Sequence, residues 1–225
     1  MTGRIALAVM AKVPAAGEVK TRLCPPLAPA EAATLAECFL LDRLEQLREV
    51  PDADALVAFA PRERRPALRG LVPADVRLVP QEGADLGARL DRVLTDLLAE
   101  GYTGAIAVDA DSPTLPTAYL RRACAALRED AVDAVLGPCE DGGYYLIGLR
   151  APAPALFGDM PWSTAAVTQE ALARARRLGL RLVLLPSWFD VDRGEDLARL
   201  RTAGPLEAYQ PVRTLAFLRA ARMPA

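Results

Sequence analysis

Short apolar runs alternate with segments of helical periodicity along most of the chain. The runs that are typical of buried strands cover residues 4–11, 54–60, 76–81, 104–111 and 181–186. Apolar positions at helical spacing cover residues 30–47, 84–100, 117–130, 163–179, 193–201 and 214–222. Segment 131–149 predicts two more strands that are joined by a turn. This order predicts an α/β protein with three layers, α/β/α, in which helices cover both faces of a mostly parallel sheet.

The chain shows no sign of a boundary between domains. Its 225 residues contain no internal repeat, no low-complexity segment and no stretch that resembles a linker. A chain of this length can build one large hydrophobic core. We therefore expect residues 1–225 to form a single domain.

Three clusters of polar residues directly follow expected strands. They are the loop from Lys12 to Arg22, the pair Asp109 and Asp111, and the pair Asp190 and Asp192. In open α/β sheets, ligands bind outside the carboxyl ends of the strands. Each cluster is therefore a candidate for a ligand site, and ordinary loop chemistry is the alternative for each.

The loop AKVPAAGEVKTRL (11–23) holds Lys12 and Lys20, the two lysines of the chain, together with Thr21 and Arg22. It contains neither a Walker motif nor a GxGxxG motif. Lysine supplies a point charge and arginine a planar fork, and both suit phosphate groups. Two interpretations stay open: the loop wraps an anionic group, or its charges contact only water.

The segment AVDADSPTLP (107–116) places Asp109 and Asp111 at the expected end of a strand. Alternate residues of a strand share a face, so both carboxylates can point the same way. Such a pair favours Mg²⁺, with Asp111 as the better ligand because it lies nearer the strand end. The alternative is a pair of turn residues before Ser112 and Pro113.

The segment SWFDVDRGEDL (187–197) contains Asp190 and Asp192. Asp192 followed by Glu195 three residues later also fits a helix N-cap with its reciprocal partner. Asp190 has no such local explanation, which leaves it a candidate metal ligand.

Weaker signals surround these three clusters. Asp141, Gly142 and Gly143 predict a hairpin turn first, and a close approach of backbone amides to a ligand second. Tyr144 or Tyr145 would then line the ligand pocket. The hydroxyls of PWST (161–164) are candidates to cap a helix, and Gln81 follows a strand where an amide could contact a nucleobase.

Composition excludes several classes of protein. The chain has no histidine, which excludes Ser-His-Asp triads, Cys-His pairs and HExxH zinc sites. Its four cysteines show no CxxC spacing, which favours reduced, packed thiols. A net charge of −2 argues against a nucleic-acid partner. No stretch approaches eighteen apolar residues, and the first apolar run is too short for a signal peptide. We therefore expect no membrane partner and a cytoplasmic location.

Six motifs in order resemble a known family: AKVPAAGEVKTRL, QEGADLGARL, DADSP, GPCEDGGYYLIGL, PWST and DVDRGEDL. They are similar to the GT-A-fold "transferase 1, rSAM/selenodomain-associated" group, which is glycosyltransferase-like. The similarity runs from residue 4 to about residue 202. A more distant likeness is to 2-phospho-L-lactate guanylyltransferase and other nucleotidyltransferases. The resemblance implies a nucleotide-diphospho-sugar transferase-like fold.

The resemblance also implies a nucleotide across the carboxyl edge of the sheet, with Mg²⁺ (or Mn²⁺) bridging its phosphates. Lys20, Arg22 and Asp111 are then the expected catalytic residues. The expected binding residues are Lys12, Lys20, Thr21 and Arg22 for the phosphates, Gln81 and Gly87 for the base, Asp111 with Asp192, Asp190 and Asp109 for the metal, and Asp141, Gly142, Gly143 and Tyr144 for the acceptor.

Two positions depart from the family pattern. Arg193 and Gly194 stand where relatives usually carry Thr-Pro, and Glu18 stands where a basic residue is common. The first departure bears on the geometry around Asp192. The second lowers the positive potential of the first loop.

The expected activity is nucleotidyl transfer from a nucleoside triphosphate to a small anionic acceptor, with release of pyrophosphate. The lysine-TRL loop favours this reaction because it suits a departing pyrophosphate. The alternatives are glycosyl transfer from a nucleoside-diphosphate sugar, with Asp141 as the candidate base, and nucleotide binding without turnover. The apolar TLAFL stretch near the C-terminus makes a homodimer a further expectation.

Overall fold

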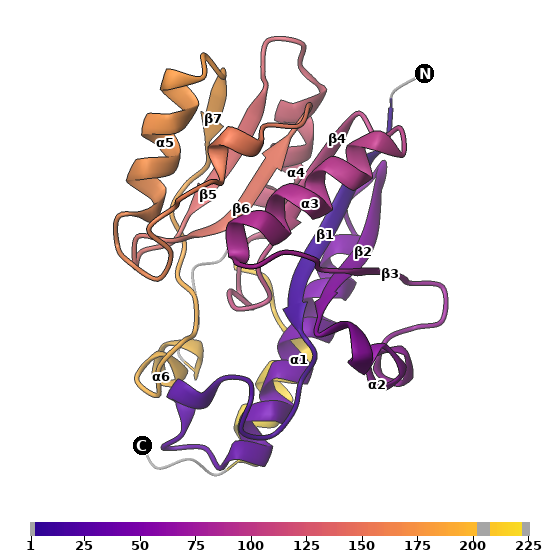
Figure 1. Cartoon of the computed structure of the whole chain (residues 1–225). Coiled ribbons are helices and arrows are strands. Elements are labelled where there is room, and N and C mark those ends of the chain that lie inside the picture. Colours follow the sequence, from indigo (N-terminus) through magenta and orange to yellow (C-terminus); the bar gives the residue numbers. More distant parts are fainter. Residues whose placement is uncertain (1–2, 202–207, 222–225) are drawn as a thin grey trace.

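The computed structural model describes residues 3–201 and 208–221. One sheet contains all seven strands of these residues: β1 (Ile5–Lys12), β2 (Ala53–Ala60), β3 (Arg77–Pro80), β4 (Gly104–Val108), β5 (Ala134–Pro138), β6 (Tyr144–Leu149) and β7 (Leu182–Leu184). The α-helices are α1 (Pro29–Arg48), α2 (Arg65–Leu71), α3 (Leu86–Ala99), α4 (Thr117–Arg128), α5 (Val167–Arg177), α6 (Asp196–Arg201) and α7 (Val212–Ala220). Short 3₁₀ turns cover Thr21–Leu23, Arg62–Arg64 and Pro154–Leu156. The prediction of a three-layer, mostly parallel α/β fold is confirmed (Figure 1).

The strand order is β3-β2-β1-β4-β6-β5-β7. Strand β6 is antiparallel to β4 and β5, and the other neighbouring strands are parallel. The order reverses direction between β1 and β4, because β2 and β3 lie on one side of β1 and the later strands on the other. Chain connections diverge at such a point and leave a crevice at the carboxyl edge. The loops that follow β1 and β4 therefore border one crevice.

Alternation along β1 shows how the two faces are filled. Ile5, Leu7 and Val9 belong to a core that includes residues of α1, α2, α4, α6 and α7. Ala6 and Ala8 face a second core, which includes residues of α3 and α5. Figure 1 shows α3 lying across this face of the strands. Small alanines on one side of β1 allow α3 to pack close to the sheet.

Most expected elements are present, with shifted ends. The strand expected at 104–111 ends at Val108, so Asp109 and Asp111 lie in the loop beyond it. The helix expected from residue 163 begins at Val167, and Ser163 itself adopts a left-handed conformation, with φ of 63°, that a helix excludes. The connection between β2 and β3, for which the sequence pattern predicted no element, contains α2. The last residue of the helix expected at 214–222 lies outside the described residues.

The C-terminal helix α7 is attached to α1 through Asp42. This carboxylate is 1% exposed and accepts hydrogen bonds from the backbone amides of Arg213, at 3.1 Å, and Thr214, at 2.8 Å. It supplies acceptors for amides of the first turn of α7 that have no partner within the helix. Within residues 3–201 and 208–221, no helix has the length and apolarity that a membrane span requires.

Replacing Asp42 with alanine tests this attachment. We expect Asp42→Ala to lower the free energy of unfolding by about 1–3 kcal/mol, because it leaves the buried amide of Thr214 and the partly buried amide of Arg213 without this acceptor. The measurement is urea unfolding followed by circular dichroism. Glu45→Ala is the matched control, since Glu45 pairs with the same Arg213 but is 56% exposed. Its effect should stay below about 0.5 kcal/mol, and equal losses in both variants would contradict the role of Asp42.

Candidate active site

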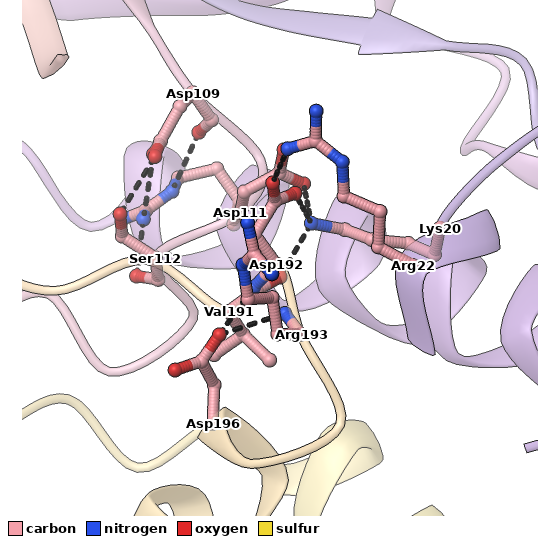
Figure 2. Close-up of polar contacts among 10 residues, drawn as sticks. Lys20, Arg22, Asp109, Asp111, Ser112, Val191, Asp192, Arg193 and Asp196 are labelled. Atoms are coloured by element: carbon pink, nitrogen blue, oxygen red, sulfur yellow. Dashed lines mark hydrogen bonds and ion pairs between the residues drawn. The ribbon is translucent and has the colours of Figure 1, made fainter. Parts of the chain in front are cut away.

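Three segments that are far apart in the sequence meet at the ammonium group of Lys20. Its Nζ lies 2.9 Å from Oδ1 of Asp111 and 3.6 Å from Oδ1 of Asp192, and it donates a hydrogen bond of 2.6 Å to the carbonyl oxygen of Val191. Figure 2 shows the loop after β1, the loop after β4 and the segment before α6 converging on this group. The structure therefore brings the first loop and both acidic clusters together.

Local structure at Lys20 directs its side chain inward. Its backbone is left-handed, with φ of 50°, and immediately precedes the 3₁₀ turn Thr21–Leu23. The side chain is 7% exposed, and Nζ lies 5.6 Å from the centre of the Phe39 ring. Burial opposes the charge of Lys20 and acts to lower its pKa. The carboxylates of Asp111 and Asp192 have the larger combined effect and raise the pKa of Lys20 above its ordinary value. Lys20 therefore carries a buried positive charge at neutral pH.

The loop also forms one wall of a first cavity, of about 300 Å³. Nζ of Lys12 donates a hydrogen bond of 2.8 Å to the carbonyl oxygen of Glu18, which holds the loop in a curve. Nη1 of Arg22 lies 2.8 Å from Oδ2 of Asp192. The polar lining of this cavity includes Lys12, Lys20, Thr21, Arg22, Asp111 and Asp192. All four phosphate-binding candidates thus surround one space.

Asp109 and Asp111 do not point the same way, so the expectation from strand alternation is wrong. Because β4 ends at Val108, both residues follow loop geometry and their side chains diverge. Oδ1 of Asp109 lies 3.5 Å from Nη2 of Arg43, and Oδ2 accepts a hydrogen bond of 2.6 Å from Ser112. Burial is the main cause that raises the pKa of Asp109 to about 7, and the neighbouring Asp111 adds to the shift. Asp111 alone of the pair faces Lys20.

Arg43 is a supporting residue that the sequence did not reveal. Its side chain is fully buried and donates hydrogen bonds to the carbonyl oxygens of Asp109, at 3.1 Å, and Ser112, at 2.5 Å. It also donates to the side chain of Gln46, one turn further along α1. The loop after β4 is thus attached to α1 from behind. An arginine within an amphipathic helix gives no sequence signal that separates this role from a solvent-exposed one.

The segment before α6 is held by Asp196. Its Oδ2 accepts hydrogen bonds from the backbone amides of Asp192, at 2.9 Å, and Arg193, at 2.7 Å. The alternative interpretation, in which the Asp192 side chain caps a helix with Glu195 as its partner, is therefore wrong. Asp196 supplies the acceptor instead, which leaves the carboxylate of Asp192 free to contact Lys20 and Arg22.

A second cavity, of about 810 Å³, adjoins the first. Its polar lining includes Asp109, Asp111, Asp141, Tyr144, Asp190 and Asp192. Burial, together with the charges of Asp141, Asp111 and Asp192, raises the pKa of Asp190 to about 6. Three possible metal-ligand atoms lie within 4.8 Å of one another, and they belong to Cys139, Asp141 and Asp190. This cavity therefore concentrates negative charge.

The hairpin between β5 and β6 forms one wall of the second cavity, and its prediction from Asp141, Gly142 and Gly143 is confirmed. Oδ1 of Asp141 accepts a hydrogen bond of 2.8 Å from the amide of Gly143. Gly142 has a φ of 95°, and a Cβ there would lie 2.3 Å from the carbonyl oxygen of Ala165. Glycine therefore lets the hairpin touch the loop before α5. Asp141, Gly143 and Tyr144 line the cavity, whereas Gly142 positions the turn.

The two candidates for base recognition lie outside the lining of both cavities. Nε2 of Gln81 donates hydrogen bonds to the carbonyl oxygens of Ala58, at 2.8 Å, and Ala11, at 3.3 Å. Gly87 is buried, and a Cβ there would lie 2.6 Å from the carbonyl oxygen of Phe157. In this structure Gln81 links the ends of two strands and Gly87 permits close helix packing. Their contact with a base stays a prediction.

The two cavities share Arg22, Asp111 and Asp192. Both lysines of the chain lie on one side of this border, and most of the lining carboxylates lie on the other. The oxygen ligands of Asp111, Asp192 and the nearby Asp190 are of the kind that Mg²⁺ and Mn²⁺ prefer. The lysine side of this border thus offers donors to an anionic group, and the carboxylates at the border and beyond it offer oxygen ligands to a hard cation.

Residues 43–164 match the model of a family described as "uncharacterized protein conserved in bacteria (DUF2064)". The chain belongs to this family. A solved structure of similar architecture is a protein from Desulfovibrio desulfuricans G20 that is described as a candidate nucleotide-diphospho-sugar transferase. It is 31% identical, with a TM-score of 0.88, over 96% of this chain and 94% of that one.

Two further proteins are similar to this chain. A phosphoenolpyruvate guanylyltransferase from Rubrobacter xylanophilus is 36% identical over 138 residues, which cover 59% of this chain and 64% of that protein. The match thus spans less than two thirds of this curated relative. A nucleotidyl transferase from Methanothermobacter thermautotroptrophicus is 18% identical, with a TM-score of 0.57, over 96% of this chain and 99% of that one, and it shows the shared fold alone. Membership of the narrower rSAM-associated group stays a prediction.

The raised pKa of Asp109 predicts that the free energy of unfolding depends on pH. Between about pH 4 and pH 7 the folded chain holds a proton here that the unfolded chain has lost. As the pH rises through this range, the free energy of unfolding of wild type should fall by about 1–3 kcal/mol relative to that of Asp109→Asn. Urea unfolding in EDTA, at intervals from pH 4 to 8, measures both curves. The control is Asp75→Asn, at a site that is 65% exposed. Parallel curves for wild type and Asp109→Asn would show that the prediction is wrong.

Proposed function

We propose that this protein is a nucleotidyltransferase that moves a nucleoside monophosphate from a nucleoside triphosphate to a small anionic acceptor. The observation that carries the proposal is the border of Arg22, Asp111 and Asp192, which two adjacent cavities share. A group transfer needs two substrates whose reacting atoms meet. The shared border is the place where a ligand in the first cavity and one in the second would meet.

The first cavity suits the triphosphate. Lys20 supplies a buried charge that its carboxylate neighbours maintain, and Lys12 and Arg22 add donors at the rim. The backbone curve between Lys12 and Glu18 shapes this wall. The similar protein from Rubrobacter xylanophilus is named as a guanylyltransferase, which is an enzyme of this reaction class.

The carboxylates at the border and beside it are of the kind that a hard divalent cation binds. Asp111 and Asp192 face the same point, as their shared contact with Lys20 shows, and burial among other carboxylates raises the pKa of Asp190 to about 6. We propose Asp111, Asp192 and Asp190 as ligands of Mg²⁺ or Mn²⁺. Asp109 is less suited because it bonds to Arg43 and Ser112. When bound, the ion would neutralise charge on the phosphate oxygens.

In the proposed reaction, an oxygen of the acceptor attacks the α-phosphorus of the nucleoside triphosphate. A new P–O bond forms, the bond between the α-phosphorus and the bridging oxygen breaks, and pyrophosphate departs with that electron pair. Lys20 and Arg22 would stabilise the charge that grows on pyrophosphate. Loss of one such donor costs about 3–4 kcal/mol in barrier at comparable oxyanion sites.

The name of the guanylyltransferase relative suggests an acceptor. Phosphoenolpyruvate is a small phosphorylated acid whose phosphate oxygen could attack in this way. We propose a compound of this kind as the occupant of the second cavity, whose lining includes the hairpin, the loop before α5 and the segment before α6.

Glycosyl transfer is the second candidate. Asp141 lines the second cavity, where a carboxylate could act as the base on an acceptor hydroxyl. The similar protein from Desulfovibrio desulfuricans is named for nucleotide sugars. In this case the sugar would pass to the acceptor and a nucleoside diphosphate would leave.

Thermal unfolding with a ligand panel separates the two candidates. The panel pairs each nucleoside triphosphate with the matching nucleoside-diphosphate sugar, in the presence of Mg²⁺. A ligand at 100 times its dissociation constant should add roughly 2.7 kcal/mol of stability. Stabilisation by a triphosphate, followed by pyrophosphate release with phosphoenolpyruvate, supports nucleotidyl transfer. Stabilisation by sugar nucleotides alone would refute it.

Two substitutions test the site itself. We expect Lys20→Ala and Asp111→Asn to abolish the stabilisation by nucleotide, because they remove the buried cation and its carboxylate partner at the border. Both variants should stay folded, which circular dichroism checks. Arg121→Gln, an exposed substitution on α4, is the control that changes net charge but lies outside the cavity linings. Wild-type nucleotide binding by both site variants would mean that the site is misplaced.

A further inference from the structure

One arginine that lines the second cavity has a side chain without a hydrogen-bond or ion-pair partner in the described part of the chain. Three arginines line this cavity: Arg22, Arg193 and Arg199. Arg22 pairs with Asp192, and Arg199 pairs with Glu140 while its guanidinium lies 3.8 Å from the centre of the Phe189 ring. Among residues 3–201 and 208–221, the side chain of Arg193 has no hydrogen-bond or ion-pair partner.

The backbone of Arg193 is held by neighbouring segments. Its amide donates a hydrogen bond of 2.7 Å to the carboxylate of Asp196. The next residue, Gly194, packs so close to the segment after the first loop that a Cβ there would lie 2.7 Å from Cδ of Pro26. The guanidinium is thus carried at the edge of the cavity by a segment held on two sides.

The cavities that Arg193 lines indicate which substrate it meets. It lines the second cavity and, with Arg22, an adjoining space of about 620 Å³, but it does not line the first cavity. A triphosphate in the first cavity would meet Lys20 and Arg22 rather than Arg193. Arg193 therefore belongs to the acceptor side of the border.

An anionic acceptor needs a positive group on that side. The carboxylates that line the second cavity are Asp109, Asp111, Glu140, Asp141, Asp190, Asp192 and Asp196. A cation at the border would offset the charge near Asp111 and Asp192, but an acceptor with a second anionic group that extends away from the border needs a further positive group there. A guanidinium binds a carboxylate through two parallel hydrogen bonds.

We infer that Arg193 is an acceptor-binding residue that selects acceptors with a carboxylate in addition to the phosphate that attacks. The inference rests on the proposed function and extends it to one residue.

Two probes that differ in one group test the inference. They are 2-phosphoglycerate and glycerol 2-phosphate, in which a hydroxymethyl group replaces the carboxylate. Isothermal titration with Mg²⁺ measures both dissociation constants for wild type, Arg193→Gln and Arg193→Lys. Arg121→Gln on α4 is the matched control for the loss of one positive charge. Titration with GTP on the same preparations reports nucleotide binding separately.

We expect wild type and Arg121→Gln to bind 2-phosphoglycerate about tenfold more tightly than glycerol 2-phosphate, because only the first probe has a carboxylate for the guanidinium. Arg193→Gln should bring this ratio close to one and leave the affinity for glycerol 2-phosphate unchanged. Arg193→Lys should keep part of the preference, since it keeps the charge but loses the planar fork.

Three outcomes would overturn the inference: an unchanged ratio in Arg193→Gln, a ratio near one in wild type, or no binding of either probe. If GTP still binds in those cases, the role of Arg193 fails while the nucleotide site stands. If wild type binds neither GTP nor any other nucleoside triphosphate of the thermal-unfolding panel, the proposed function fails as well.

Discussion

The buried ammonium of Lys20 is the constraint on which the rest of the site depends. It lies 2.9 Å from a carboxylate oxygen of Asp111 and 3.6 Å from one of Asp192, and it bonds to the backbone at Val191. A buried charge is tolerated only where opposite charges and hydrogen bonds replace water. The three segments that supply these partners are therefore held together by the charge they surround, and their convergence creates the border between the two cavities.

Support for this border comes from residues that do not line the first cavity. Arg43 attaches the loop after β4 to α1, and Asp196 holds the segment that carries Asp192. Both side chains form hydrogen bonds with backbone groups of irregular segments. The carboxylates of Asp111 and Asp192 therefore stay available to other partners. The site thus combines loops, which can present polar groups, with anchors that fix where those groups point.

Much of the fold and part of the site could be predicted from the sequence. Alternating strands and helices predicted the three layers, and the rule for parallel sheets predicted that Lys20 and Asp111 would share an edge. The direction of Asp109 could not be predicted, because it depended on β4 ending at Val108 rather than at residue 111. The role of Arg43 was also hidden, because only the packing of α1 against the loop after β4 gives its buried guanidinium acceptors.

The sequence by itself determined which residue types follow each strand and the order in which strands and helices occur. Those properties are local, since hydrophobic periodicity and turn chemistry depend on neighbouring residues. Only the tertiary structure decided that the strand order reverses between β1 and β4, that Asp192 faces Lys20 rather than capping α6, and that Arg193 lines the second cavity and not the first. Each of these depends on contacts between segments far apart in the chain, and such contacts leave no periodic trace in the sequence.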